Sequence, residues 1–144
     1  ISAEQVAIEL TETVLATDEH GEIATLRRLR EHGCKVALDD FGTGWSSLSC
    51  LRDLPIDLVK LDRSFITPLT TSPRAAAMVE AIIRLGDALG LTVVAEGVET
   101  EEQFVALQSL GCHRIQGFHV SKPVTPEDFL DLLLHNRDDA DRFG

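Results

Sequence analysis

The amino-acid sequence predicts an α/β fold in which five parallel strands alternate with helices. Three observations predict it: five short apolar runs rich in Val, Ile and Leu, segments of helical periodicity between them, and glycines where those segments stop. Strand–helix–strand units normally give parallel strands with right-handed crossovers. The alternation is compatible with an open doubly wound sheet and with a closed (β/α)₈ barrel, of which five strands would be only a part.

The five apolar runs are predicted to be strands. They lack strict alternation with polar residues, which is typical of parallel strands covered on both faces. The predicted strands are Val6–Leu10, Lys35–Leu38, Leu58–Leu61, Thr92–Ala95 and Arg114–Phe118.

Helices are predicted between the strands. Glu22–His32 ends at Gly33, a residue that readily follows a helix C-terminus, and Ser46–Arg52 is a short helix closed by Leu54–Pro55. The segment Ala75–Leu89 is a longer amphipathic helix that Gly90 ends.

Two further helices carry clear start signals. Thr100 and Gln103 form a capping box, and Thr125–Pro126 places a proline at the first helical position. The apolar face predicted for the last helix includes Phe129, Leu130, Leu133 and Leu134.

Length, charge and cysteine content limit the function. The 144 residues fit one domain, and 44% hydrophobic residues are enough for a core. A net charge of −11 argues against binding to DNA or RNA polymers. Three widely spaced cysteines indicate reduced thiols in a cytoplasmic protein, and no segment is predicted to span a membrane.

Polar residues gather where the predicted strands end. Because the carboxyl ends of parallel strands meet at one edge of the sheet, these side chains are expected to share one site. The set comprises seven acids, one lysine and one glutamine: Glu9, Glu12, Asp39, Asp40, Lys60, Asp62, Glu96, Glu99 and Gln116.

So many carboxylates in a small volume repel one another, and divalent cations are the usual compensation. Oxygen ligands favour Mg²⁺, Mn²⁺ or Ca²⁺ over zinc, and adjacent Asp39 and Asp40 suit a pair of ions. Simpler structural roles remain open, since acids such as Asp62 also cap helices. Lys60 could be an ion-pair partner, although a lysine within an apolar strand suggests a polar site.

Five ordered motifs resemble the EAL-domain phosphodiesterases, bacterial enzymes that cut cyclic di-GMP to linear pGpG. They are Glu9-Leu10-Thr11-Glu12, Asp39-Asp40-Phe41-Gly42-Thr43-Gly44, Leu58-Val59-Lys60-Leu61-Asp62, Ala95-Glu96-Gly97-Val98-Glu99 and Gln116-Gly117-Phe118. The resemblance spans nearly the whole chain and implies a modified TIM barrel. It also implies a Mg²⁺ or Mn²⁺ two-metal site, with cyclic di-GMP as substrate.

The resemblance also implies roles for single residues. Glu9, Asp39 and Asp40 match metal ligands. Lys60 matches a lysine that helps to hold the catalytic water, and Glu96 matches a general base or metal-site glutamate. Supporting roles fall to Glu12, which anchors the loop Asp39–Leu48, and to Asp62, Glu99 and Gln116.

The family's Glu-Ala-Leu tripeptide and an early Asn ligand do not occur here. Residues 1–144 are therefore interpreted as a single EAL domain that is incomplete at its N-terminus. As an isolated fragment it is expected to be poorly stable, to self-associate, or to represent only the ordered portion of a longer chain, and its activity is expected to be weak. The family further implies a homodimer and upstream sensory or cyclase domains. The alternative function is a non-catalytic cyclic di-GMP receptor or interaction module.

Overall fold

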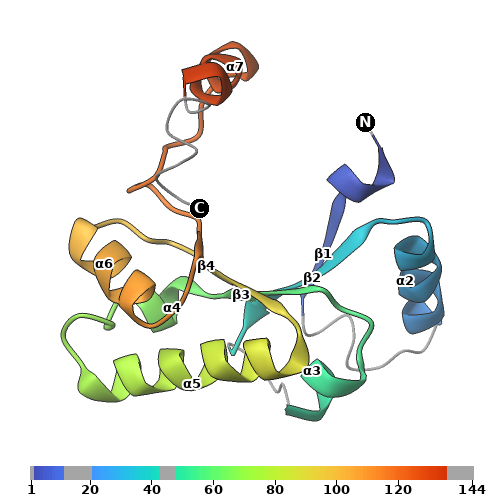
Figure 1. Cartoon of the computed structure of the whole chain (residues 1–144), viewed down its shortest axis with the longest axis horizontal. Helices are drawn as coiled ribbons and strands as arrows, with labels where there is room; N and C mark the ends of the chain where they lie inside the picture. Colours follow the sequence, from blue (N-terminus) through green and yellow to red (C-terminus); the bar gives the residue numbers. More distant parts are fainter. Residues whose placement is uncertain (1, 12–20, 43–47, 136–144) are drawn as a thin grey trace.

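The computed structural model describes residues 2–11, 21–42 and 48–135, and contains one five-stranded parallel sheet (Figure 1). Its strands lie side by side in sequence order, each hydrogen-bonded to the next. They are β1 (Ala7–Thr11), β2 (Lys35–Phe41), β3 (Leu58–Leu61), β4 (Thr92–Ala95) and β5 (Arg114–Ile115). The predicted parallel alternation of strands and helices is confirmed.

The strand order distinguishes the two architectures that the sequence left open. A doubly wound sheet reverses its strand order at a switch point, whereas successive strands of a (β/α)₈ barrel are neighbours throughout. Here the order β1-β2-β3-β4-β5 has no reversal. In Figure 1 the helices α2, α3, α5 and α6 follow one side of the sheet. The sheet is therefore a five-stranded segment of a TIM-like barrel.

Short sequence signals set the helix boundaries. Thr100 accepts the backbone N–H of Gln103 and completes the predicted capping box, while Pro73 occupies the first turn of α5 behind the N-cap Ser72. A short helix after β3 was not predicted. The helical elements are η1 (Ala3–Gln5), α2 (Glu22–Glu31), α3 (Leu48–Asp53), α4 (Arg63–Ile66), α5 (Pro73–Leu89), α6 (Glu101–Ser109) and α7 (Pro126–His135).

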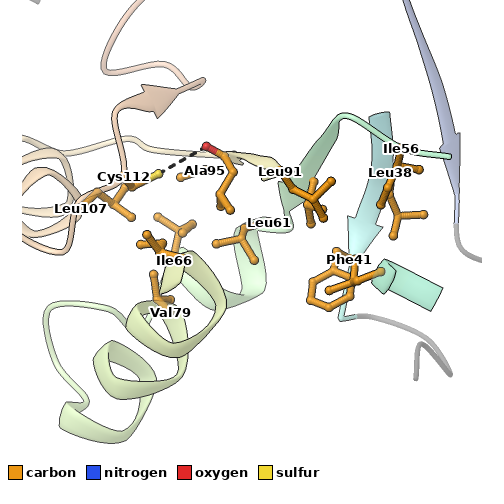
Figure 2. Close-up of a cluster of buried hydrophobic side chains, with 14 of the residues drawn as sticks. Leu38, Phe41, Ile56, Leu61, Ile66, Val79, Leu91, Ala95, Leu107 and Cys112 are labelled. Carbon is orange, nitrogen blue, oxygen red and sulfur yellow. Dashed lines mark hydrogen bonds between the residues drawn. The ribbon is translucent and has the colours of Figure 1, made fainter. Parts of the chain in front are cut away.

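The hydrophobic core lies between the central strands and the helices α4, α5 and α6. Leu38 of β2 and Leu61 of β3 are fully buried, as are Val79 of α5 and Leu107 of α6 (Figure 2). These residues pack the central strands against the helices, and the same strands carry much of the polar site described below.

Two expectations about strands were wrong, and the apolar face of the last helix is exposed. The strand β1 is not covered on both faces, since exposed and half-buried residues alternate along it. The apolar residues Phe129, Leu130 and Leu134 of α7 are more than half exposed, and α7 lies apart from the other helices in Figure 1. The strand β5 ends at Ile115 rather than Phe118. An apolar pattern in the sequence shows which face of a helix or strand favours burial, but it does not show which element will cover that face.

No helix among the described residues has the length and hydrophobicity needed to cross a membrane. Cys34 and Cys112 are free thiols.

Candidate active site

The alternation of side chains along the strands places four predicted site residues on one face of the sheet. Glu9 is paired with Ala37, and Ala37 is paired with Leu58. Side chains two residues apart share a face of a strand, so Glu9, Asp39 and Lys60 point to the same side. Val94 of β4 is paired with Lys60, and Glu96 comes two residues later. The Glu96 side chain therefore points to the same side as that of Lys60. The core leucines face the opposite way, towards the helices.

Lys60 lies at the centre of this group. Its Nζ is 2.8 Å from Glu9 Oε2, 3.2 Å from Asp39 Oδ1 and 2.7 Å from Glu96 Oε1. The Lys60 side chain is only 9% exposed, whereas the Glu9 side chain is 50% exposed. Burial by itself would lower the pKa of Lys60, but the hydrogen bonds to Glu9, Glu96 and Asp39 outweigh it and raise that pKa. Lys60 is therefore an ammonium at neutral pH and donates hydrogen bonds to three carboxylates.

A bulge in β2 brings Asp40 to the same site as Asp39. Neighbouring residues of a regular strand point to opposite faces, so one of the two aspartates should face away. However, Leu38 pairs with Val59 and Phe41 with Leu61, which leaves two residues of β2 opposite Lys60 alone. Asp40 also adopts a left-handed backbone conformation, with a φ of 54°. Because of this extra residue and the left-handed turn at Asp40, the carboxylates of Asp39 and Asp40 both reach the same site.

The resulting acidic cluster has the donor set of a site for a hard divalent cation. One carboxylate oxygen from each of Asp39, Asp40 and Glu96 lies within 4.8 Å of the other two. Glu9 adds a fourth carboxylate through its contact with Lys60. Carboxylate oxygens are the ligands that Mg²⁺, Mn²⁺ and Ca²⁺ prefer, so these residues fit such an ion.

Beside this cluster, a cavity of about 260 Å³ is lined by Glu96 and by three more of the predicted residues. It lies at the carboxyl ends of β3, β4 and β5, where active sites of parallel α/β folds form. Its lining residues are Asp62, Arg63, Glu96, Gly97, Glu99, Gln116, Gly117 and Phe118. The strand ends thus converge as the sequence predicts, and Glu96 belongs both to the acidic cluster and to the cavity wall.

Two of the lining acids already have structural partners. Asp62 is the N-cap of α4, and its Oδ1 accepts the backbone N–H of Ser64 at 2.9 Å. Glu99 forms an ion pair with Arg63, with nitrogen–oxygen distances of 3.1 and 3.2 Å. Arg63 was not among the predicted site residues, although its position directly after Asp62, at the end of a strand, is the same signal that identified the acids.

Glu12 and the residues 43–47 of the predicted loop Asp39–Leu48 lie outside the described residues. The described start of that loop contacts α4, because a Cβ atom at Gly42 would overlap the ring of Phe65. The start of the loop is thus packed against α4, the helix that directly follows Asp62.

A larger cavity, of about 720 Å³, lies at the opposite edge of the sheet. It is lined by Glu4, Cys34, Lys35 and Asp57, which lie before strands or at the start of a strand. Two of its charged residues already pair, since Arg30 donates two hydrogen bonds to Asp57. Position and chemistry therefore favour the smaller cavity as the functional one.

Comparison with known proteins connects this geometry to a family. The family model for the EAL domain matches residues 1–123. The chain is 45% identical over 133 residues to the cyclic di-GMP phosphodiesterase PA2567 of Pseudomonas aeruginosa. That match covers 92% of the chain but only 23% of the relative, so the chain spans about a quarter of its length.

Solved structures give the same result for the fold. The crystal structure of the EAL domain of Mycobacterium smegmatis DcpA matches with a TM-score of 0.88 and 44% identity, over 94% of this chain and 60% of that one. Klebsiella pneumoniae BlrP1, solved as a complex with manganese and cyclic di-GMP, matches with a TM-score of 0.75 and 41% identity. This match covers 82% of the chain and 30% of BlrP1.

Proposed function

Because the chain belongs to the EAL domain family, we propose that it carries the metal-dependent hydrolysis of cyclic di-GMP to linear pGpG. One observation carries the proposal: oxygens of Asp39, Asp40 and Glu96 lie within 4.8 Å of one another, beside Lys60 and an adjoining cavity. Such a cluster can hold cations against the phosphate of a dinucleotide, which explains how an acidic chain binds an anionic substrate.

Glu9, Asp39 and Asp40 would hold two ions, Mg²⁺ or Mn²⁺, and the manganese complex of BlrP1 supports this choice of metal. When bound, the ions would supply the charge that neutralises the phosphate and that lowers the pKa of a water molecule. The left-handed turn at Asp40 and the bulge in β2 support this assignment, because they bring the two aspartates to the same site.

Glu96 and Lys60 would act on the attacking water. Glu96 can accept a proton as a carboxylate, whereas the Lys60 ammonium can only donate a hydrogen bond and so would orient the water or a phosphate oxygen. The water oxygen forms a bond to phosphorus as the bond from phosphorus to the 3′ oxygen breaks, which leaves a 5′ phosphate on pGpG.

The remaining residues would support the substrate or the loops around it. Gln116 and Glu99 line the cavity beside Glu96, and Asp62 fixes the start of α4 at the same cavity. Glu12 would anchor the loop after Asp40.

The decisive experiment incubates the full-length protein that carries this chain with cyclic di-GMP and either Mg²⁺ or Mn²⁺, and resolves the nucleotides by chromatography. The proposal expects pGpG, and expects EDTA to abolish its formation. Binding of cyclic di-GMP without any pGpG would contradict hydrolysis and would favour the receptor function.

We also propose that residues 1–144 form part of a larger EAL domain. The chain corresponds to 60% of the DcpA EAL chain, and β1 and β5 are edges of the described sheet. The proposal includes a homodimer and sensory or cyclase domains upstream in the parent protein. The free thiols Cys34 and Cys112 support a reducing, cytoplasmic location.

A further inference from the structure

The loop that follows β4 carries Glu96 and Glu99, and its backbone is held at almost every position. In this loop, residues 96–100, the Glu96 N–H donates to the Leu61 carbonyl oxygen at 3.0 Å. The N–H groups of Glu99 and Thr100 both donate to Gln103 Oε1, at 2.9 and 3.2 Å. A loop held by its main chain has little freedom to reorient its side chains.

The middle of the loop is held by the segment after β5. Val98 is fully buried, and its N–H donates to the Gln116 carbonyl oxygen at 3.2 Å. The Val98 carbonyl oxygen in turn accepts the N–H of His119 at 3.0 Å. Gly117 lies between these two hydrogen bonds.

Gly117 permits this approach because it has no side chain. A Cβ atom at Gly117 would overlap the nitrogen and the carbonyl oxygen of Val98, which are main-chain atoms and cannot rotate away. A Cβ atom at Gly97 would lie 2.7 Å from the side chain of Arg63, whose guanidinium pairs with Glu99. The loop therefore packs closely against both Arg63 and the backbone of Gly117.

We infer that Gly117 is a positioning residue, which sets Glu96 and Glu99 through its backbone contact with Val98. This inference rests on the proposed function of the same site, because it concerns how that site is held for its ions. Any residue larger than glycine must displace Val98. Val98 is two residues after Glu96 and one residue before Glu99, so its displacement moves the Glu96 oxygen that now lies 2.7 Å from Lys60.

The first test compares Gly117→Ala with Gly90→Ala in the full-length protein. A Cβ atom at Gly90 meets nothing within 4 Å, but the φ of 70° makes alanine strained there, so this control lowers stability without touching the site. We expect Gly117→Ala to weaken Mn²⁺ binding, measured by titration calorimetry, by about 10–100-fold, because it moves Glu96, whose carboxylate belongs to the acidic cluster with Asp39 and Asp40. We expect kcat for cyclic di-GMP to fall with it, and Gly90→Ala to retain wild-type values of both.

A folded Gly117→Ala protein that binds Mn²⁺ within about twofold of wild type would overturn the inference. Hydrogen exchange in the wild type provides a second test, which stands even if the variant does not fold. The amides of Val98 and His119 should exchange as slowly as those of β4. Exchange as fast as in an exposed loop would contradict the inference.

The two proposals fail in different ways. A wild-type protein that releases no pGpG refutes the proposed function. The hydrogen-exchange comparison and the Mn²⁺ titration of Gly117→Ala would still decide whether Gly117 holds the loop.

Discussion

Lys60 Nζ lies 2.7 Å from Glu96 Oε1, and this contact joins the middle of β3 to the residue directly after β4. The same ammonium contacts Glu9 of β1 and Asp39 of β2. One buried lysine thus connects four successive strands at the carboxylate cluster. Without it, three acids would repel one another in a partly buried site.

Lys60→Met should therefore destabilise the protein when no divalent cation is present. We expect the free energy of unfolding to fall by about 1–3 kcal/mol, less than for a fully buried ion pair because Glu9 is half exposed. Mn²⁺ should restore stability, since an ion that binds only the folded state at 100 times its Kd adds about 2.7 kcal/mol. Urea unfolding with and without Mn²⁺ measures both effects. The control is Lys122→Met, which removes an exposed lysine; equal losses in the two variants would count against the role of Lys60.

Asp39→Asn and Glu96→Gln should abolish hydrolysis while the fold survives. Each change keeps the shape of the side chain but removes a negative charge from the cluster. We expect turnover of cyclic di-GMP to fall at least about 100-fold. The control, Asp87→Asn, removes an exposed acid of α5 and should leave turnover unchanged. Circular dichroism checks the fold, and wild-type turnover in either site variant would refute its assignment.

Two substitutions of Asp40 can separate the effect of its backbone conformation on stability from the effect of its carboxylate on metal binding. Its φ of 54° suits glycine better than alanine, because a Cβ atom is disfavoured in the left-handed region. Asp40→Gly and Asp40→Ala both remove the carboxylate, so both should weaken Mn²⁺ binding. Their stabilities should differ, with the alanine variant less stable by about 1 kcal/mol. Thermal unfolding without metal measures this difference, and a more stable alanine variant would show that Asp40 does not adopt this conformation.

The N-cap Asp62 predicts a dependence of stability on pH. Hydrogen bonds from Ser64 lower the pKa of the Asp62 carboxyl group in the folded state. A lowered pKa stabilises the protein above the unfolded value of about 4, and this stabilisation is lost as pH falls through the folded value. Asparagine also caps helices but has no charge. Asp62→Asn should therefore be less stable than wild type at pH 7, and the difference should shrink below about pH 4. A difference that grew on acidification would contradict this reasoning.

Much of the fold follows from local patterns. The bounds of β3 and β4 agree with the sequence prediction, and α6 and α7 begin after Thr100 and at Pro126, where the capping box and the proline indicate. These features depend on residues that are close in the sequence. The boundaries of β5 and the short helix α4 were missed because such brief elements have too few residues to show a period.

The candidate site was predictable in its membership but not in its geometry. Acids at strand ends must converge in a parallel sheet, so the grouping of Asp39, Glu96 and Lys60 follows from the sequence pattern. The bulge that brings Asp40 beside Asp39 has no local signature, since aspartates also stand in loops and at helix caps. The exposed apolar face of α7 shows the same limit.

The sequence by itself determined which residues form strands and which acids stand at their ends, because hydrophobic periodicity and capping act over a few residues. Only the tertiary structure decided that Lys60 joins Glu9, Asp39 and Glu96, and that Gly117 meets Val98. Such contacts join segments far apart in the chain, and they depend on the pairing register of neighbouring strands and on the packing of the whole domain.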